Sequence, residues 1–108
     1  MEYKRADALV STEWLASHLS APDVRVVDAS YYLPTQNRDA REEYLEEHVA
    51  GAVFLDIDDV AADDSPYPHM IPTPEKFASR VRKLGLGNGN RVVDYDGTGF
   101  ASAAARVW

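Results

Sequence analysis

The sequence predicts an α/β domain in which a mostly parallel central sheet carries helices on both faces. Short apolar segments rich in β-branched residues alternate along the chain with segments of helical character. The apolar segments lack the strict polar–apolar alternation that marks a sheet with one face in water. Three or four strands are few for such a sheet, so we expect the 108 residues to be an incomplete domain of a longer protein.

The first third of the chain predicts a helix and then a strand. Residues 10–19, VSTEWLASHL, favour a short helix capped by Ser11 or Thr12, because a hydroxyl there accepts a hydrogen bond from a free backbone N–H group. The side chains of this helix that face the core are predicted to be Trp14, Leu15 and Leu19. The apolar run after the next turn predicts the first strand at residues 24–28.

The middle of the chain predicts a charged helix, a second strand and a long loop. Residues 38–48, RDAREEYLEEH, favour the helix, and residues 51–57, GAVFLDI, favour a buried strand entered through Gly51. Residues 58–72 have no apolar periodicity and contain three prolines. Long ordered loops in compact domains often carry function.

The last third predicts the clearest helix, a third strand and an apolar terminal helix. Within residues 73–90, Thr73 suits the N-cap, Pro74 suits the first helical position and Gly85 suits the left-handed residue that ends a helix. The third strand is predicted at residues 91–95. The Ala-rich residues at the end of the chain predict the final helix.

The composition excludes several classes of partner and site. A net charge of −7 disfavours nucleic acid and anionic membrane surfaces, and no apolar run reaches the length of a membrane span. The absence of cysteine removes disulfides and thiolate nucleophiles. The aspartates of residues 56–64 lack the spacing of a calcium loop, so no metal is expected. Because the N-terminus has no apolar signal segment, we expect a cytoplasmic protein.

The third strand leads into a loop that contains Asp96, Gly97, Thr98 and Gly99. A strand, a glycine loop and a helix in this order can hold an anion on backbone N–H groups. With Asp94, the loop resembles the D-x-D-G-T motif of haloacid-dehalogenase-type phosphotransferases. Only ten residues follow Thr98, too few for the other motifs of those enzymes, so phosphotransfer ranks third among our functional hypotheses.

Two histidines are candidates for a specific role. His69 lies in the proline-bracketed stretch SPYPHMIP, which can hold a side chain in one orientation. If the loop folds back onto Asp58, the carboxylate fixes the tautomer of the imidazole, as the acid of a catalytic triad does. On spacing alone a purely structural His69 is the commoner outcome, and both interpretations stay open. His48, between the charged helix and the second strand, is expected to bond the backbone of the turn.

Around His48 the chain resembles the rhodanese (sulfurtransferase) family. The first signature of that family places an aromatic residue four positions before a histidine, followed by a Pro-Gly-Ala turn. The matching residues here are Tyr44, His48, Gly51 and Ala52. Ala50 replaces the proline. The similarity to the N-terminal domain of two-domain sulfurtransferases covers residues 9–108. It implies that residues 1–108 form a rhodanese-like domain that lacks its last strand and helix and a second, cysteine-bearing domain.

The resemblance also implies a function. Asp58 and His69 match a pair that belongs to 3-mercaptopyruvate sulfurtransferases and is absent from bovine-type thiosulfate sulfurtransferases. There the pair supports a catalytic cysteine of the second domain. The parent enzyme is then expected to move sulfur from 3-mercaptopyruvate or thiosulfate, through a cysteine persulfide, to thioredoxin, a small thiol or cyanide, without a cofactor. This piece is expected to be inactive alone. A non-catalytic rhodanese-like binding or regulatory module is the alternative.

Asp96 matches the position of the nucleophilic cysteine in the family's catalytic domains, which implies that residues 96–99 form a degenerate active-site loop. Its carboxylate is expected to accept the N–H groups that would otherwise stabilise a thiolate. Because a carboxylate cannot carry sulfur, the chemistry of this domain is expected at Asp58 and His69, which would face the second domain. Without its last strand, the sheet is expected to have an unpaired edge.

Overall fold

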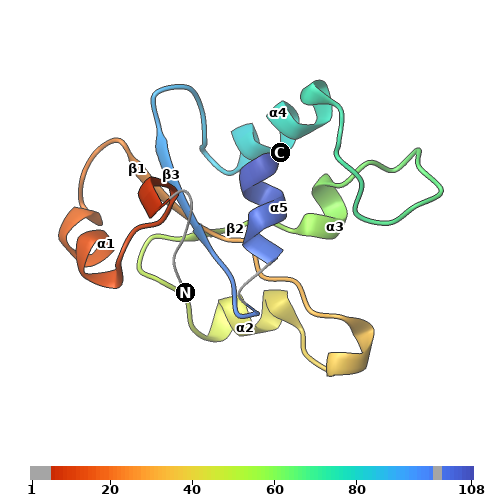
Figure 1. The fold of residues 1–108 in the computed structure, drawn as a ribbon, viewed down its shortest axis with the longest axis horizontal. Helices are drawn as coiled ribbons and strands as arrows, with labels where there is room; N and C mark the ends of the chain where they lie inside the picture. The colour runs from red at the N-terminus through yellow and green to blue at the C-terminus, as the bar shows by residue number, and fades with distance from the viewer. Residues whose placement is uncertain (1–5, 99–100) are drawn as a thin grey trace.

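The computed structural model describes residues 6–98 and 101–108, which fold around a three-stranded parallel sheet (Figure 1). Strand β1 (Val24–Asp28) is central, with β2 (Val53–Phe54) on one side and β3 (Arg91–Tyr95) on the other. Val26 pairs with Val93 and Val27 pairs with Val53, both in parallel register. The predicted parallel sheet is confirmed, and two of its strands have the predicted bounds.

Within the described residues, five α-helices and two 3₁₀ turns surround the sheet. The helices are α1 (Thr12–His18), α2 (Ala40–Glu46), α3 (Ile57–Val60), α4 (Pro74–Lys83) and α5 (Ala101–Val107), and the 3₁₀ turns span Ala6–Ala8 and Pro34–Gln36. The predicted caps form where the sequence places hydroxyl groups: Ser11 accepts a hydrogen bond from the backbone of Trp14, and Thr73 accepts one from Lys76. Gly85 ends α4 with φ +84°. Side-chain capping thus sets where these two helices begin.

The helices cover both faces of the sheet, as predicted. On one face Val24, Val26 and Ala52 pack against side chains of α1 and α2. On the other face Val27, which is 1% exposed, packs with residues of α3 and against side chains of α4 and α5. Figure 1 shows α3, α4 and α5 together on one side of the sheet, with α1 on the opposite side. Because β1 is buried on both faces, it is apolar without period-two alternation.

Three details of the prediction are wrong. The second strand has two residues instead of the predicted 51–57, because the Asp56 side chain accepts the backbone N–H groups of Asp58 and Asp59 and so starts a helix at once. The predicted loop 58–72 therefore begins inside α3. Leu19 is 38% exposed, since α1 ends at His18 and leaves Leu19 beyond its core-facing side.

Strand β3 lies at an edge of the sheet. Within the described residues it pairs with β1 alone, and Val92 near its start is 49% exposed. An edge of this kind presents unpaired backbone groups along the strand. The predicted unpaired edge is present.

Candidate functional site

The carboxyl ends of the three strands meet at one edge of the sheet because the strands are parallel. Two groups of polar side chains lie there. The first is the pair of Asp58 and His69, which we call the Asp–His pair. The second is the loop after β3, with Asp96 at its start. Residues 30–32, which follow β1, touch both groups.

The Asp–His pair is joined by a direct contact. The Nε2 atom of His69 lies 2.8 Å from Oδ1 of Asp58. In the neutral imidazole this geometry requires Nε2–H as the donor, since a carboxylate only accepts. Nδ1 is then the nitrogen left for other chemistry. The His69 side chain is 34% exposed and the Asp58 side chain 66% exposed, so the pair is open to an incoming molecule.

Two neighbouring elements bring Asp58 and His69 together. Asp58 lies in the first turn of α3, where its own N–H donates to the Asp56 side chain at 3.0 Å. His69 lies in the loop between α3 and α4, whose ends are joined by a hydrogen bond from the Ala62 N–H to the Met70 carbonyl at 2.9 Å. His69 itself has φ +58°, in the left-handed region that residues other than glycine seldom adopt. The closed loop thus returns His69 to the start of α3.

Tyr31 is a neighbour of the pair that the sequence did not reveal. Its ring packs edge-on against the imidazole of His69, with 4.5 Å between the centroids and 69° between the planes. Burial raises the pKa of Tyr31, and the negative charge of Asp58 raises it further. The phenol is therefore held in its neutral form beside the pair.

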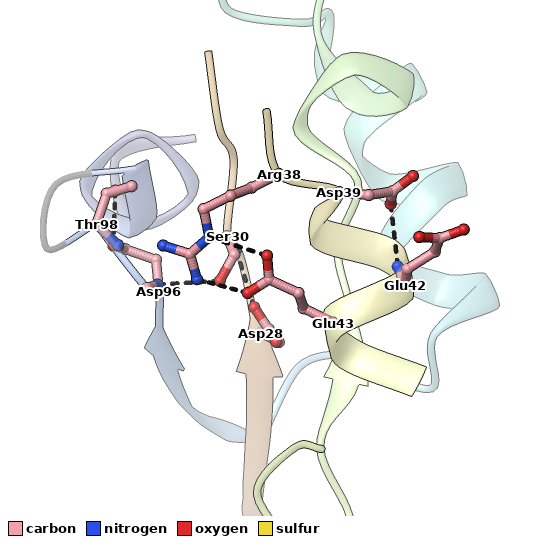
Figure 2. A network of polar contacts seen from close by, with 9 residues as sticks. Asp28, Ser30, Arg38, Asp39, Glu42, Glu43, Asp96 and Thr98 are labelled. Carbon is pink, nitrogen blue, oxygen red and sulfur yellow. Dashed lines mark hydrogen bonds and ion pairs between the residues drawn. The ribbon is translucent and has the colours of Figure 1, made fainter. Parts of the chain in front are cut away.

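The Asp96 carboxylate lies inside the loop after β3 (Figure 2). Its Oδ1 accepts hydrogen bonds from the N–H of Thr98 at 2.7 Å and from the Thr98 hydroxyl at 2.9 Å. Its Oδ2 accepts the N–H of Ser102, in the first turn of α5, at 2.6 Å. An anion already occupies these donors, as the sequence led us to expect. Gly99 lies outside the described residues.

Gly97 is required where this loop passes the segment after β1. A Cβ atom on Gly97 would overlap the hydroxyl of Tyr32. The Gly97 N–H donates to the hydroxyl of Ser30 at 3.1 Å, and Figure 2 shows Ser30 between the loop and β1. Ser30 is 6% exposed, so its hydroxyl is committed to this contact. The two segments are therefore tied together at the carboxyl end of the sheet.

Arg38 and Glu43 form a bidentate ion pair beside the loop, which the sequence analysis missed. Arg38 Nε lies 2.9 Å from Oε2 of Glu43, and the second Arg38 nitrogen lies 2.5 Å from Oε1. The guanidinium also stacks on the ring of Tyr32, 4.0 Å from its centroid. The hydrogen bonds from Arg38, together with its positive charge, hold the pKa of Glu43 below its usual range. The two residues are five positions apart across a helix start, a spacing with no recognisable pairing pattern in sequence.

A shallow depression of about 600 Å³ lies between this ion pair and the loop. Its lining includes Ser30, Arg38, Glu43, His48 and Asp96. Arg38 is held by Glu43, and the N–H groups of Thr98 and Ser102 are held by Asp96. These donors of the described residues around the depression are therefore already engaged by acidic side chains of the chain itself.

The four residues of the family signature form the joint between α2 and β2. The Tyr44 hydroxyl donates to the Ala52 carbonyl at 2.6 Å, and Gly51 takes φ +79°. Nδ1 of His48 lies 2.6 Å from the Tyr44 carbonyl, and the two rings stack with 4.1 Å between centroids. His48 thus bonds the backbone of α2 and belongs to the joint, away from the Asp–His pair.

Two kinds of feature are absent from the part of the chain that the structure describes. No group of three His, Cys, Asp or Glu side chains there is arranged to hold a metal ion. No helix among those residues is long and apolar enough to cross a bilayer.

The comparisons with known proteins place this chain beside sulfurtransferases. It is 47% identical to human 3-mercaptopyruvate sulfurtransferase and 49% identical to bovine thiosulfate sulfurtransferase, covering 94% of this chain in each case. The crystal structure of the 3-mercaptopyruvate sulfurtransferase SseA from Escherichia coli, described as having the rhodanese fold, superposes with a TM-score of 0.80 and 40% identity over 93% of this chain. No family model matches the chain.

The match covers only part of each relative. The chain spans 36% of the human enzyme, 35% of the bovine enzyme and 38% of the bacterial structure. The identities to the two kinds of enzyme are nearly equal. By sequence and by fold, this chain is a partial-length, rhodanese-fold homologue of the sulfurtransferase family, related to the N-terminal portion of 3-mercaptopyruvate and thiosulfate sulfurtransferases.

Proposed function

We propose that the chain is the N-terminal, non-nucleophilic domain of a sulfurtransferase that uses 3-mercaptopyruvate in preference to thiosulfate. The homology supports sulfur transfer as the chemistry of the parent protein. The choice of 3-mercaptopyruvate as the sulfur donor rests on the contact of 2.8 Å between His69 and Asp58, because this contact gives the domain an oriented acid–base group. The chain has no cysteine, so the persulfide is formed on a second domain.

The proposed reaction needs no cofactor, because the electrons of the broken carbon–sulfur bond stay with the leaving group. A cysteine thiolate of the second domain attacks the sulfur of 3-mercaptopyruvate, and the carbon–sulfur bond breaks. The cysteine becomes a persulfide, and the bond's electrons leave as the enolate of pyruvate, which takes up a proton. A thiol acceptor such as thioredoxin, or cyanide, then attacks the outer sulfur and releases the cysteine thiolate.

His69 is the group that we assign to the leaving side of this reaction. Asp58 holds Nε2, so Nδ1 faces the substrate. In its protonated form the imidazole donates the Nδ1 proton to the departing enolate or to its carbonyl oxygen. Thiosulfate leaves as sulfite, which needs no proton on carbon. His69 therefore matters for one donor much more than for the other.

A chimera tests this assignment. The matching N-terminal part of the Escherichia coli 3-mercaptopyruvate sulfurtransferase, 40% identical over 100 residues, is replaced by this chain. His69→Asn is expected to lower kcat with 3-mercaptopyruvate by about a hundredfold, the usual size of an acid–base contribution, and to change kcat with thiosulfate little. The control is His18→Asn, since His18 contacts the carbonyl and the ring of Trp14 within its own helix. Equal losses with both donors would remove the assignment.

The second candidate function is a non-catalytic binding or regulatory module. The observation in its favour is that Asp96 occupies the anion cradle of the loop after β3. A chimera that folds but transfers sulfur from neither donor would favour the module. The isolated chain is expected to be inactive under both proposals. The homology to sulfurtransferases also gives the DYDGT motif an origin other than phosphotransfer.

A further inference from the structure

The backbone of His69 adopts an unfavourable conformation. Its φ of +58° belongs to the left-handed region, which costs free energy for a residue with a side chain. Such a conformation persists only where surrounding contacts hold it. For His69 these contacts are the hydrogen bond to Asp58 and the edge-on ring of Tyr31.

The two contacts restrict different motions of the ring. The bond from Nε2 to Asp58 fixes one atom of the imidazole, but by itself leaves the ring free to rotate about the bond. The Tyr31 ring, at 69° to the imidazole and 4.5 Å from it, blocks that rotation. Together the contacts determine where Nδ1 points.

Tyr31 is itself fixed by the residues on either side of it. Ser30 donates its N–H to Asp28 at 3.0 Å and accepts the Gly97 N–H at 3.1 Å. Tyr32 lies against Gly97 on the same side. Ser30 and Tyr32 thus both contact Gly97 of the loop after β3, whereas the ring of Tyr31 between them contacts the imidazole of His69. The pKa of Tyr31, raised by burial and by the charge of Asp58, agrees with a ring lying against the pair.

We propose that Tyr31 is a positioning residue, which fixes the plane of the His69 imidazole so that Nε2 stays on Asp58 and Nδ1 faces the substrate. Through Ser30 and Gly97, the degenerate loop then serves as the support of the Asp–His pair. The role in turnover rests on the proposed function, whereas the geometry of the ring can be measured without it.

The test is ¹⁵N NMR of the histidine side chains in the 108-residue chain, at an alkaline pH where imidazole is neutral. In the wild type we expect His69 to be almost entirely the Nε2–H tautomer. Tyr31→Phe, which keeps the ring, is expected to leave the tautomer unchanged. Tyr31→Leu, which removes the ring, is expected to give a mixture of tautomers and to lower the Nε2–H fraction severalfold. Tyr67→Leu is the control, since Tyr67 lies in the same loop as His69, between α3 and α4, and is 67% exposed.

The outcomes separate the two proposals. An unchanged His69 tautomer in folded Tyr31→Leu overturns the positioning role, even if His69→Asn impairs the chimera. If Tyr31→Leu does not fold, Tyr31→Met replaces it, because the flexible methionine side chain fills irregular space without an aromatic ring. An unchanged His69 tautomer in folded Tyr31→Met then overturns the positioning role. In the chimera, Tyr31→Leu is expected to lower kcat with 3-mercaptopyruvate, and Tyr31→Phe to restore it. A tautomer change in Tyr31→Leu with no effect of His69→Asn on turnover supports the positioning and removes the proposed function.

Discussion

Asp96 gives the loop after β3 its own negative charge. In this structure the carboxylate takes the N–H groups of Thr98 and Ser102 that an external anion would otherwise use. Hydrogen bonds to a charged acceptor are stronger than those between neutral groups, and a donor left without its acceptor must be desolvated at a cost. Under the proposed function, the residue that stands where a sulfur-carrying cysteine would be is thus also the residue that holds the shape of this loop.

Asp96→Ala is expected to lower the free energy of unfolding by about 1–3 kcal/mol, because it leaves these donors without their acceptor. Urea denaturation followed by circular dichroism measures the change. Asp64→Ala is the control, since Asp64 is exposed in the loop after α3. Equal stability of the two variants would contradict a structural role for the Asp96 carboxylate.

Asp94, two residues earlier, should make stability depend on pH. Burial raises the pKa of Asp94 above its ordinary value, and the charge of Asp96 adds to the rise, while a backbone hydrogen bond and Arg106 lower it. Between the ordinary and the raised pKa the folded state binds more protons than the unfolded state, so stability falls as the pH rises through that interval. Asp94→Asn is expected to flatten this part of the curve.

Urea midpoints of the wild type and Asp94→Asn, measured from acidic to neutral pH, test the sign of this effect. The variant should gain stability relative to the wild type as the pH rises. A constant difference between the two proteins at every pH would show that the Asp94 pKa is the same in the folded and unfolded states.

Among the elements, the loop after β3 and the segment after β1 depend on each other. Gly97 has no room for a side chain because Tyr32 packs against it, and Ser30 binds its N–H. The segment after β1 therefore contacts the loop through Ser30 and Tyr32, and it contacts His69 through Tyr31. A substitution in either segment should therefore alter the contacts between Gly97 and residues 30–32.

Gly97→Ala is expected to cost about 1–3 kcal/mol of stability, the usual penalty for an added methyl group in a packed site. Tyr32→Phe removes the overlapping hydroxyl, so the double variant should recover part of that loss, and a double-mutant cycle measures how much. Gly87→Ala is the control, because a Cβ at Gly87 meets open space. Strictly additive effects of the two substitutions would show that the residues do not touch.

At the scale of the whole molecule, the three strands place both polar groups at one edge and leave β3 at the border of the sheet. The sulfurtransferases that the chain matches are about three times as long as the matched part. The Asp–His pair and the start of β3 are both exposed. Under the proposed function, these are the surfaces that the rest of the parent protein would cover.

Much of this arrangement follows from the sequence alone. Local signals determine the bounds of β1, β3 and α4, because apolar runs and the caps at Thr73 and Gly85 act within a few residues. The absence of cysteine excludes a thiolate nucleophile in this chain. The spacing of Asp58 and His69 suggested a contact, which the fold then formed.

Other features depended on the tertiary structure, because they join segments that are distant in sequence. The pairing of Ser30 with Gly97, 67 residues apart, and the contact of Tyr31 with His69 arise only when β1 and β3 lie side by side and the loop closes over α3. The early end of β2 was also hidden, since the Asp56 side chain competes locally with a strand signal that the apolar residues provide. Sequence thus determined most of the elements and the absence of a thiolate in this chain, whereas the packing of distant segments decided which side chains surround His69.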